Sequence, residues 1–268
     1  MSNVKSKVWP TAMTVAGSDS GGGAGIQADL KMFHALQVHG TCAITCVTAQ
    51  NLQGVTGVEP MSPQMLGLQM KAVAAGYPVG AIKTGMLFSQ EIIEAVAKSL
   101  KSFKKIPVVV DPVAVATSGA TLLKPDALTA LKELILPLAT LVTPNLDEVS
   151  ALTGLEVTSP EAMRKAARAI YGTYGCAVLV KGGHLARTMP ALDVFYDGKT
   201  ELLLTAPRLK GKATHGTGCT YSAAITAYLA RGKSLSDSVK LAKQRITESI
   251  AMSVRTGKSW ILNPVSKP

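Results

Sequence analysis

Cysteine and long apolar runs are both scarce in this sequence, and each scarcity excludes a class of protein. Four cysteines among 268 residues are too few for the disulfide framework that stabilises small secreted domains. Gly, Pro, Lys or Asp interrupts every apolar stretch before it reaches the roughly 18 residues that a membrane-spanning helix needs. The first residues also lack the apolar core and cleavage site of a secretory signal. We therefore expect a cytoplasmic protein that does not cross a membrane.

Three common catalytic motifs are absent as well. No G-x-S-x-G occurs, so nothing indicates the nucleophile elbow of a hydrolase. The G-K-[ST] endings at Gly198, Gly232 and Gly257 lack the glycine that begins a Walker A phosphate loop. Cys42 and Cys46 do not have zinc-ligand spacing, and we expect them to share one face of a buried strand. An enzyme that uses a nucleotide must therefore hold its phosphates in another way.

What the chain does contain is enough apolar material for a large core. Hydrophobic residues make up 47% of the chain and charged residues 17%, which excludes intrinsic disorder. No Pro/Ser-rich linker divides the chain and no internal repeat is visible. We expect one domain over residues 1–268, with residues 1–10 as a loose N-terminal extension.

The net charge of +11 comes almost entirely from the last quarter of the chain. Residues 1–207 hold 17 Lys/Arg against 15 Asp/Glu, whereas residues 208–268 hold 11 against 2. Nucleic-acid grooves interleave such charge with aromatic residues, and this region has few, at Tyr221, Tyr228 and Trp260. We expect no nucleic acid as a partner. The basic residues either form a solvated face on terminal helices or attract a polyanionic small molecule.

Short apolar runs alternate with amphipathic stretches along the whole chain. Such alternation predicts an α/β fold in which helices cover both faces of a mostly parallel sheet. Strands are expected at 11–16, 41–48, 79–84, 107–110, 140–143 and 177–181. Helices are expected at 24–36, 63–75, 90–103, 125–134, 146–153, 160–174, 218–230 and 235–254. Residues 55–61 and 193–205, the latter turned by Asp197-Gly198, read as small antiparallel hairpins.

Ligands of such sheets bind beyond the carboxyl ends of the strands, and a glycine-rich loop follows the first strand. The loop fails the dinucleotide fingerprint, because Ile26 stands where a third glycine is required. Two interpretations of the loop remain open. It is a tight turn in which Ser20 or Asp19 lies near the helix cap, or Asp19 hydrogen-bonds a substrate hydroxyl.

A second glycine-containing segment, residues 214–220, leads into a predicted helix. Its small residues leave backbone N–H groups unpaired at the helix start, where they and the helix dipole can bind an anion. Cys219 lies in the first turn, where the pKa of a thiol falls and a thiolate can act as a base. Alternatively, Cys219 is a small buried residue in a capped helix.

Three charged residues follow other predicted strands. Asp111 ends an apolar strand and precedes Pro112, and Glu148 lies in the first turn of a helix. Mg²⁺ prefers one or two carboxylates with waters and phosphate oxygens, although each residue also fits a simple turn or helix-start role. Lys181 ends a strand before two glycines, where it can reach a phosphate.

Seven segments taken together carry a family resemblance: AGSDSGGGAGIQADLK (16–31), ITCVTAQN (44–51), IKTGML (82–87), VVVDPV (108–113), TPNLDEVSALTG (143–154), VLVKGGH (178–184) and THGTGCTYSAAI (214–225). These segments span residues 11 to about 232. In the segments and in their order, the chain resembles the hydroxymethylpyrimidine/phosphomethylpyrimidine kinases of thiamin biosynthesis, which belong to the ribokinase-like superfamily. The resemblance implies a ribokinase-like three-layer sandwich, phosphorylation of hydroxymethylpyrimidine and then of its monophosphate, and ATP and Mg²⁺ as cofactors.

The resemblance also implies roles for individual residues. The anion hole would consist of the N–H groups of Gly216, Thr217, Gly218 and Cys219, with Cys219 as the base. Asp111 and Glu148 would hold Mg²⁺, partly through water, and Lys181 and Thr217 would bind ATP phosphates. The residues implied to line the pyrimidine site are Gly17, Asp19, Ala24, Thr48, Gln50, Met86 and Val113, with Gln50 on the ring edge.

The sequence departs from the family pattern at Ala114, where a larger residue is usual, and at Ala213, where a polar one is usual. Ala114 lies beside the predicted pocket and therefore bears on substrate fit. Two alternatives to the pyrimidine kinase remain: a pyridoxal/pyridoxine kinase on the same scaffold and a non-catalytic ligand-binding protein. We expect a homodimer.

Overall fold

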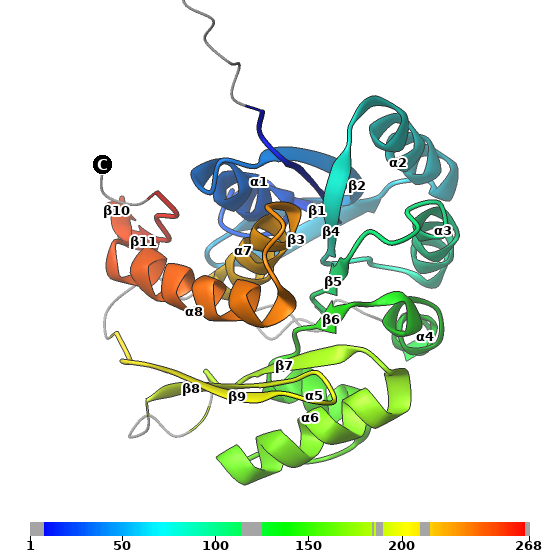
Figure 1. Cartoon of the computed structure of the whole chain (residues 1–268). Coiled ribbons are helices and arrows are strands. Elements are labelled where there is room, and N and C mark those ends of the chain that lie inside the picture. The colour runs from blue at the N-terminus through cyan, green and yellow to red at the C-terminus, as the bar shows by residue number, and fades with distance from the viewer. Residues whose placement is uncertain (1–7, 114–124, 184, 186–189, 210–214, 266–268) are drawn as a thin grey trace, which may run out of the picture.

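A nine-stranded sheet forms the centre of the molecule in the computed structural model (Figure 1). The structure describes residues 8–113, 125–183, 185, 190–209 and 215–265. Residues 1–7 of the predicted extension, and the departures at 114 and 213, lie outside the described residues. The strand order is β3-β2-β1-β4-β5-β6-β7-β8-β9. Strands β2, β1, β4, β5, β6 and β7 are parallel, whereas β3, β8 and β9 are antiparallel to their neighbours.

The strands agree closely with the predicted ranges. They are β1 (Thr11–Asp19), β2 (His39–Asn51), β3 (Gly54–Pro60), β4 (Val79–Thr84), β5 (Val108–Val110), β6 (Leu141–Val142), β7 (Ala177–Lys181), β8 (Ala191–Tyr196) and β9 (Glu201–Ala206). The predicted Asp197-Gly198 turn joins β8 to β9, and Asp197 Oδ1 accepts from the N–H groups of Lys199 and Thr200. The mostly parallel sheet with antiparallel hairpins is confirmed.

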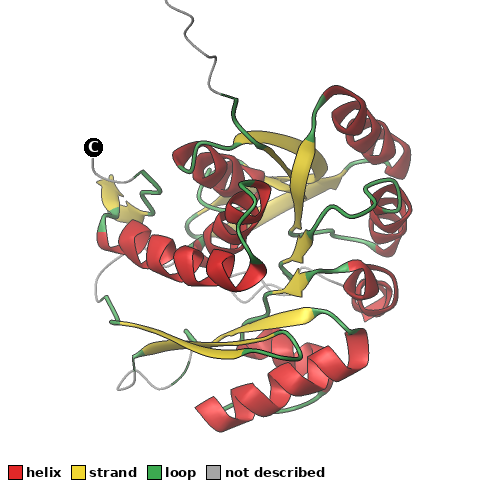
Figure 2. Cartoon of the chain, in the orientation of Figure 1, coloured by secondary structure: helices red, strands yellow, loops and turns green. Residues whose placement is uncertain are grey.

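Helices cover both faces of this sheet (Figure 2). One face carries α1 (Gly25–Ala35), α7 (Thr217–Ala230) and α8 (Leu235–Ala251). The other carries α2 (Pro63–Gly76), α3 (Gln90–Leu100), α4 (Pro125–Ala130), α5 (Leu146–Thr153) and α6 (Pro160–Tyr174). Alternation within β5 shows how one strand serves both layers, because Val108 and Val110 pack in one apolar cluster and Val109 in the other.

Local sequence signals explain where most helices begin and end. Serine side chains accept a hydrogen bond from the third helical N–H at the start of α2, α3, α6 and α8. Left-handed glycines, Gly154 and Gly175, end α5 and α6. Each described helix is too short or too polar to cross a bilayer.

The predicted helix boundaries are wrong at the C-terminal end, after residue 130 and at the end of the helix expected at 90–103, which stops at Leu100. The last helix stops at Ala251, and a hairpin of β10 (Val254–Thr256) and β11 (Ser259–Ile261) follows it. Gly257, with φ of 57°, supplies the turn, and β-branched residues supply the strands. The fourth helix continues past Ala130 as a π-helix over Leu131–Ile135 and a 3₁₀ turn over Leu136–Leu138.

Candidate active site

The carboxyl ends of the parallel strands all lie at the same end of the sheet, and α1 and α7 begin there. Helix α7 starts after Gly216, which has a φ of 77° and whose carbonyl accepts from the N–H of Thr220. Within the described residues, no backbone carbonyl accepts from the N–H groups of Gly218 and Cys219. The first turn of a helix has N–H donors and the positive end of the helix dipole, so binding of an anion at the start of α7 stays a prediction that fits this geometry.

Two glycine loops interlock beside this turn. A Cβ atom on Gly216 would collide with the carbonyl oxygen of Gly23, and a Cβ atom on Gly25 would collide with that of Gly17. Both Gly216 and Gly25 also have positive φ angles, of 77° and 55°, which other residues rarely adopt. The close approach between the loop after β1 and the start of α7 consequently requires glycine at position 216, and the turn from β1 into α1 requires glycine at position 25.

Asp111 and Lys181 lie directly under the first turn of α7. Lys181 Nζ donates to Asp111 Oδ1 at 2.9 Å. Thr143 donates to the same oxygen at 3.2 Å, and Ser222 donates to Oδ2 at 3.2 Å. A Cβ atom on Gly218 would lie 3.2 Å from Lys181 Nζ and 3.9 Å from Asp111 Oδ2. The structure thus brings a cation and a carboxylate to the predicted anion site.

The charges of this pair support each other. Burial alone would raise the pKa of the Asp111 carboxyl, but the positive charges of Lys181 and Lys83 lower it below 3.8. Burial alone would lower the pKa of Lys181, but Asp111 and then Glu148 raise it. Both side chains are therefore charged at neutral pH, and Lys181 carries a full positive charge toward the anion site.

Glu148 is held in place by a reciprocal cap at the start of α5. Its Oε2 accepts from the N–H of Asn145 at 2.7 Å, and the Asn145 side chain accepts from the N–H of Glu148 at 2.9 Å. The same segment is tied to β7, because Lys181 donates its N–H to the carbonyl of Pro144. Glu148 is only 4% exposed. The cap fixes this carboxylate near Lys181.

Cys219 differs from the sequence-based expectation. Burial raises the pKa of its thiol to about 11, and Lys83 and a backbone hydrogen bond from Gly25 offset only part of this effect, while Asp111 adds to it. The predicted lowering of the thiol pKa by the helix start is therefore wrong. The helix dipole is outweighed because the sulfur is withdrawn from water and lies among carboxylates.

Asp19 organises the glycine loop after β1. Its Oδ1 accepts from the N–H of Gly21 at 2.8 Å, and its Oδ2 accepts from the N–H groups of Gly23 at 3.0 Å and Ala24 at 2.8 Å. Nε2 of His215 lies 3.7 Å from Oδ2. Burial opposes the charge, but His215 and the three backbone donors lower the pKa of Asp19. A direct contact between Asp19 and a substrate hydroxyl stays a prediction.

The remaining residues predicted to bind substrate gather at the ends of β1, β2, β4 and β5. A Cβ atom on Gly17 would lie 3.8 Å from the Met86 sulfur. Thr48 pairs in register with Asp19, and its hydroxyl lies 3.2 Å from Oε1 of Gln50. Val113, which follows β5, donates its N–H to the carbonyl of Asp111. The structure thus brings the predicted set to one edge of the sheet.

Sequence reasoning missed a fully buried ion pair beside this site. Lys83 Nζ donates to both carboxylate oxygens of Asp29 at 2.8 Å, and Thr14 donates to Oδ2 of Asp29 at 2.6 Å. Both charged side chains are 0% exposed. Burial opposes the charge on Lys83, but Asp29 raises its pKa. A lysine inside the apolar strand VGAIKT was the available signal, because a buried lysine requires a partner.

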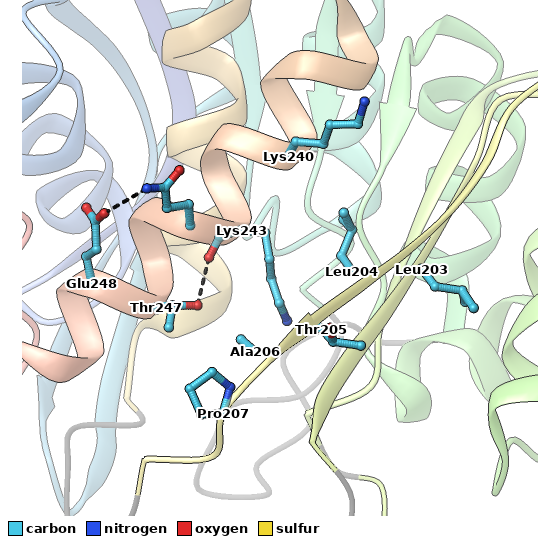
Figure 3. Close-up of a pocket in the computed structure, with 10 residues that line it drawn as sticks. Leu203, Leu204, Thr205, Ala206, Pro207, Lys240, Lys243, Thr247 and Glu248 are labelled. Carbon is cyan, nitrogen blue, oxygen red and sulfur yellow. Dashed lines mark hydrogen bonds between the residues drawn. The ribbon is translucent and has the colours of Figure 1, made fainter.

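A groove of about 500 Å³ lies between β9 and α8 (Figure 3). Residues 203–206 of β9 and the following Pro207 form one wall, and the helix contributes Lys240, Lys243, Gln244, Thr247 and Glu248. Strand β9 runs antiparallel to β8, and β8 runs antiparallel to β7. Residues 206 and 207 therefore lie at the edge of the sheet where β7 ends at Lys181.

Comparison with known proteins gives consistent matches. A family model described as phosphomethylpyrimidine kinase matches residues 19–265. A hydroxymethylpyrimidine/phosphomethylpyrimidine kinase of Rhizobium meliloti is 51% identical over 245 residues, covering 91% of each chain. A pyridoxal kinase of Bacillus subtilis, solved as an ADP complex, has a TM-score of 0.87 and 39% identity over 95% of this chain and 97% of that one. A phosphomethylpyrimidine kinase structure from Clostridium difficile has a TM-score of 0.80 and 39% identity, over 90% and 99%.

Proposed function

Because the chain belongs to the phosphomethylpyrimidine kinase family, we propose that it transfers the terminal phosphoryl group of ATP to the hydroxymethyl group of hydroxymethylpyrimidine and then to the resulting monophosphate. Its ribokinase-like fold agrees with the prediction and with its solved relatives. The observation that carries the proposal is the position of Lys181 and Asp111 under the first turn of α7. Phosphoryl transfer depends mainly on positioning and charge stabilisation, and these groups supply both.

The first turn of α7 binds the phosphoryl group during transfer. The N–H groups of Gly216, Thr217, Gly218 and Cys219 point to the anion, and the ammonium of Lys181 balances the charge that spreads over the equatorial oxygens. Lys181 is anchored at 2.9 Å to Asp111, so its ammonium needs no rearrangement when ATP binds. Such preorganisation lowers the barrier because the donors are already oriented.

The residues at the site fit Mg²⁺ held through water. Asp111 already accepts hydrogen bonds from Lys181, Thr143 and Ser222, and one oxygen of Glu148 accepts from Asn145. Among the described residues, no group of three His, Cys, Asp or Glu side chains forms a metal cage. Two carboxylates with waters and phosphate oxygens suit Mg²⁺. Bound there, the ion would supply positive charge to the phosphate oxygens, and Asp111 and Glu148 would hold it through water.

Cys219 receives the proton of the attacking hydroxymethyl group. Its sulfur lies at the start of α7, where the phosphoryl group and the substrate meet, and it accepts a backbone hydrogen bond from Gly25. A thiol with a pKa of about 11 is a strong base once ionised but is rarely ionised at pH 7. Only the thiolate form can accept the hydroxyl proton, so this small fraction is the active form, and the proton passes to the sulfur as the new P–O bond forms and the bond to ADP breaks.

The pyrimidine lies at the ends of β1, β2 and β4. Met86 and the backbone of Gly17 cover the ring, and the amide of Gln50 hydrogen-bonds its edge. The position of Gln50 is supported by Thr48, whose hydroxyl lies 3.2 Å from Oε1. Val113 and Ala24 complete the wall, and Asp19 keeps the adjoining loop in shape.

The groove between β9 and α8 receives the nucleoside of ATP. It opens at the same edge of the sheet as Lys181, and its volume of about 500 Å³ falls within the range for small-ligand sites. Lys240 adds positive charge on the approach, and the amide of Gln244 offers donor and acceptor groups to a base. A triphosphate then extends from the groove to the first turn of α7.

We also propose a homodimer and keep a cytoplasmic location as a prediction. In the described part of the chain, β3 is the last strand on its side of the sheet and pairs only with β2. Val47 and Leu52 near this edge are 44% and 45% exposed, and an exposed strand edge favours pairing with a second copy. Light scattering after size exclusion measures the mass directly, and a mass of 27.9 kDa would contradict the dimer.

The activity is tested by following ADP release with hydroxymethylpyrimidine, its monophosphate or pyridoxal, each with and without Mg²⁺. We expect Mg²⁺-dependent turnover of both pyrimidines and a lower kcat/KM for pyridoxal. Pyridoxal is tested as a substrate because the B. subtilis pyridoxal kinase has the same fold at 39% identity. A higher kcat/KM for pyridoxal would replace the pyrimidine proposal, and ATP binding without turnover would favour the non-catalytic protein.

The Lys181→Ala variant tests the phosphate site. The substitution removes the ammonium beside Gly218 and leaves the Asp111 carboxylate without its strongest partner. We expect KM for ATP to rise at least tenfold while KM for the pyrimidine changes little. An unchanged dependence of the rate on ATP concentration would show that Lys181 does not bind the phosphates of ATP.

A further inference from the structure

Asp193 connects the nucleoside groove to the loop that carries Lys181. It lies on β8 and is 4% exposed. Its two carboxylate oxygens bind groups from different elements, because Oδ1 accepts from the N–H of Gly182 at 3.1 Å and Oδ2 accepts from Nζ of Lys243 at 2.7 Å. One side chain therefore joins the end of β7 to α8.

The loop after β7 is held tightly at this point. The N–H of Gly182 also donates to the carbonyl of Leu192 at 3.0 Å, and a Cβ atom on Gly182 would collide with that carbonyl and lie 2.8 Å from the terminal methyl of Met163. Lys181 immediately precedes Gly182 and pairs in register with Asp193. Any movement of the Asp193 carboxylate is therefore transmitted to the backbone that positions Lys181.

The other end of the connection reaches the groove. Lys243 extends from α8 toward the strands (Figure 3), lines the groove and donates to both Asp193 and the carbonyl of Ala191 at 3.0 Å. Its side chain is 11% exposed. The ammonium of Lys243 is thus hydrogen-bonded to two acceptors on β8, while the rest of the side chain forms part of the groove wall.

The pair is poorly explained by stability alone. Burying two charges costs desolvation free energy, and replacing a buried ion pair by uncharged groups of similar volume is often neutral or stabilising. A hydrophobic pair would hold α8 on the sheet equally well, but it would not bind the N–H of Gly182. The direction of the Asp193 hydrogen bonds therefore points to a task beyond packing.

We propose that Asp193 is a positioning residue that, through Lys243 and Gly182, sets the distance between the nucleoside groove and the ammonium of Lys181. This inference rests on the proposed function. A triphosphate of fixed length must meet both the groove and the first turn of α7, so the spacing between α8 and the end of β7 determines whether the terminal phosphoryl group arrives in line. Misplacement by about 1 Å is expected to cost up to a hundredfold in rate.

The double variant Asp193→Asn/Lys243→Met tests this role. It removes both charges at nearly constant volume, and the asparagine carbonyl can still accept from the N–H of Gly182. We expect Tm within a few degrees of the wild type, a KM for ATP at least tenfold higher and a lower kcat, with KM for the pyrimidine unchanged. A KM for ATP within twofold of the wild type together with an unchanged kcat, at a preserved Tm, would make the pair purely structural.

A control ion pair, with side chains 35% and 22% exposed, lies at the other end of β9. Arg164 on α6 forms an ion pair with Glu201 on β9 at 3.0 Å and therefore also joins a helix to a strand. The variant Arg164→Met/Glu201→Gln should leave both KM values unchanged. An equal rise in KM for ATP in this control would show that the kinetic change follows from losing any helix–strand ion pair, and would overturn the proposal.

The Asp193→Glu variant keeps the inference testable should the double variant fail to fold. The substitution retains the charge and the partner Lys243 but lengthens the side chain by one methylene, which shifts Gly182 relative to α8. We expect a folded protein with kcat at least tenfold lower, whereas a wild-type kcat would contradict the positioning role. A wild-type enzyme without ATP-dependent turnover would instead contradict the proposed function itself.

Discussion

Cys219 combines a central position with a thiol that is difficult to ionise. Burial raises its pKa to about 11, so only about one thiol in 10⁴ is ionised at pH 7, since each pH unit below the pKa lowers the thiolate fraction tenfold. The sequence indicated the position of this residue correctly but not its pKa. The carboxylates of Asp111 and Asp29 that raise the pKa come from distant parts of the chain.

The pH dependence of turnover follows from this thiol. The thiolate fraction increases as pH rises toward 11, so the wild-type kcat should increase from pH 7 to pH 10. Cys219→Ala should lower kcat at least about a hundredfold, as loss of a general base does, and should flatten the profile over the same range. Stopped assays in overlapping buffers measure both. Parallel profiles for the two proteins, or a near-wild-type rate in the variant, would remove Cys219 as the base.

Gly218→Ala separates stability from activity at one position. A Cβ atom there would lie 3.2 Å from Lys181 Nζ, which forces the ammonium to shift by a few tenths of an ångström and narrows the anion site. Alanine is favoured over glycine in a helix by about 0.5–1 kcal/mol. We expect an unchanged or higher Tm and a kcat/KM at least about tenfold lower. A variant with the wild-type kcat/KM would show that the phosphoryl group does not bind at this turn.

Individual site residues were predictable where a strand end placed them. Asp111 and Lys181 each follow an apolar strand, and parallel strands bring such ends together. Lys83 with Asp29, and Asp193 with Lys243, were not predictable in the same way. Their partners lie 54 and 50 residues apart, and no spacing rule connects positions at those separations.

At the scale of elements, the start of α5 controls Glu148. Asn145→Ala removes the acceptor for the N–H of Glu148, which costs about 1 kcal/mol for a helix cap and lowers Tm by about 2–4 °C in a protein of this size. Because the capped turn also orients the Glu148 carboxylate, we expect the variant to need more Mg²⁺ for half-maximal turnover.

Ser159→Ala is the control for this prediction. Ser159 caps α6 by accepting from the N–H of Ala162, and it is not one of the residues proposed to bind Mg²⁺ or substrate. It should lower Tm by a similar amount without changing the Mg²⁺ dependence. A shift in Mg²⁺ dependence in both variants, or in neither, would dissociate the α5 cap from the metal site.

Helices and strands were largely predictable because hydrophobic periodicity and serine caps agree over most of the chain. Two of the wrong boundaries, those of α8 and α4, have clear local causes. The periodicity of α8 continues formally to Val254, but β-branched residues and a left-handed Gly257 favour a hairpin there. Pro137 stops α4 from continuing regularly, and the chain tightens into a 3₁₀ turn before β6.

For the whole molecule, the lowered pKa of Asp111 connects the site to stability in acid. Because the folded pKa lies below the ordinary value of 3.8, the unfolded chain binds more protons near pH 3–4 than the folded protein does. The stabilisation is therefore complete above about pH 5 and is lost as pH falls through the folded pKa. We expect Asp111→Asn to lower the slope of the free energy of unfolding against pH in this range. Urea titrations between pH 3 and pH 5 measure the slope, and equal slopes would contradict the assignment.

The alternation of strands and helices predicted the layered sheet but not the order of its strands. Crossover connections between parallel strands are right-handed and usually join neighbours, yet the chain places β1 between β2 and β4. The deciding contacts are long-range, such as the pairing of α1 with α7 across nearly the whole sequence. The excess of Lys and Arg in the C-terminal quarter is visible in the sequence, but it did not indicate that α8 would line a groove.

The contact between Gly23 and Gly216 has a consequence for how the protein is made. The two residues are separated by almost two hundred positions, and the first turn of α7 is shaped by their meeting. Chains leave the ribosome N-terminal end first, so β1, β2 and β4 emerge long before the final quarter arrives. A nascent chain arrested near residue 205 would lack α7 and α8, which cover one face of the sheet, and the proposed phosphotransfer would therefore wait for the finished polypeptide.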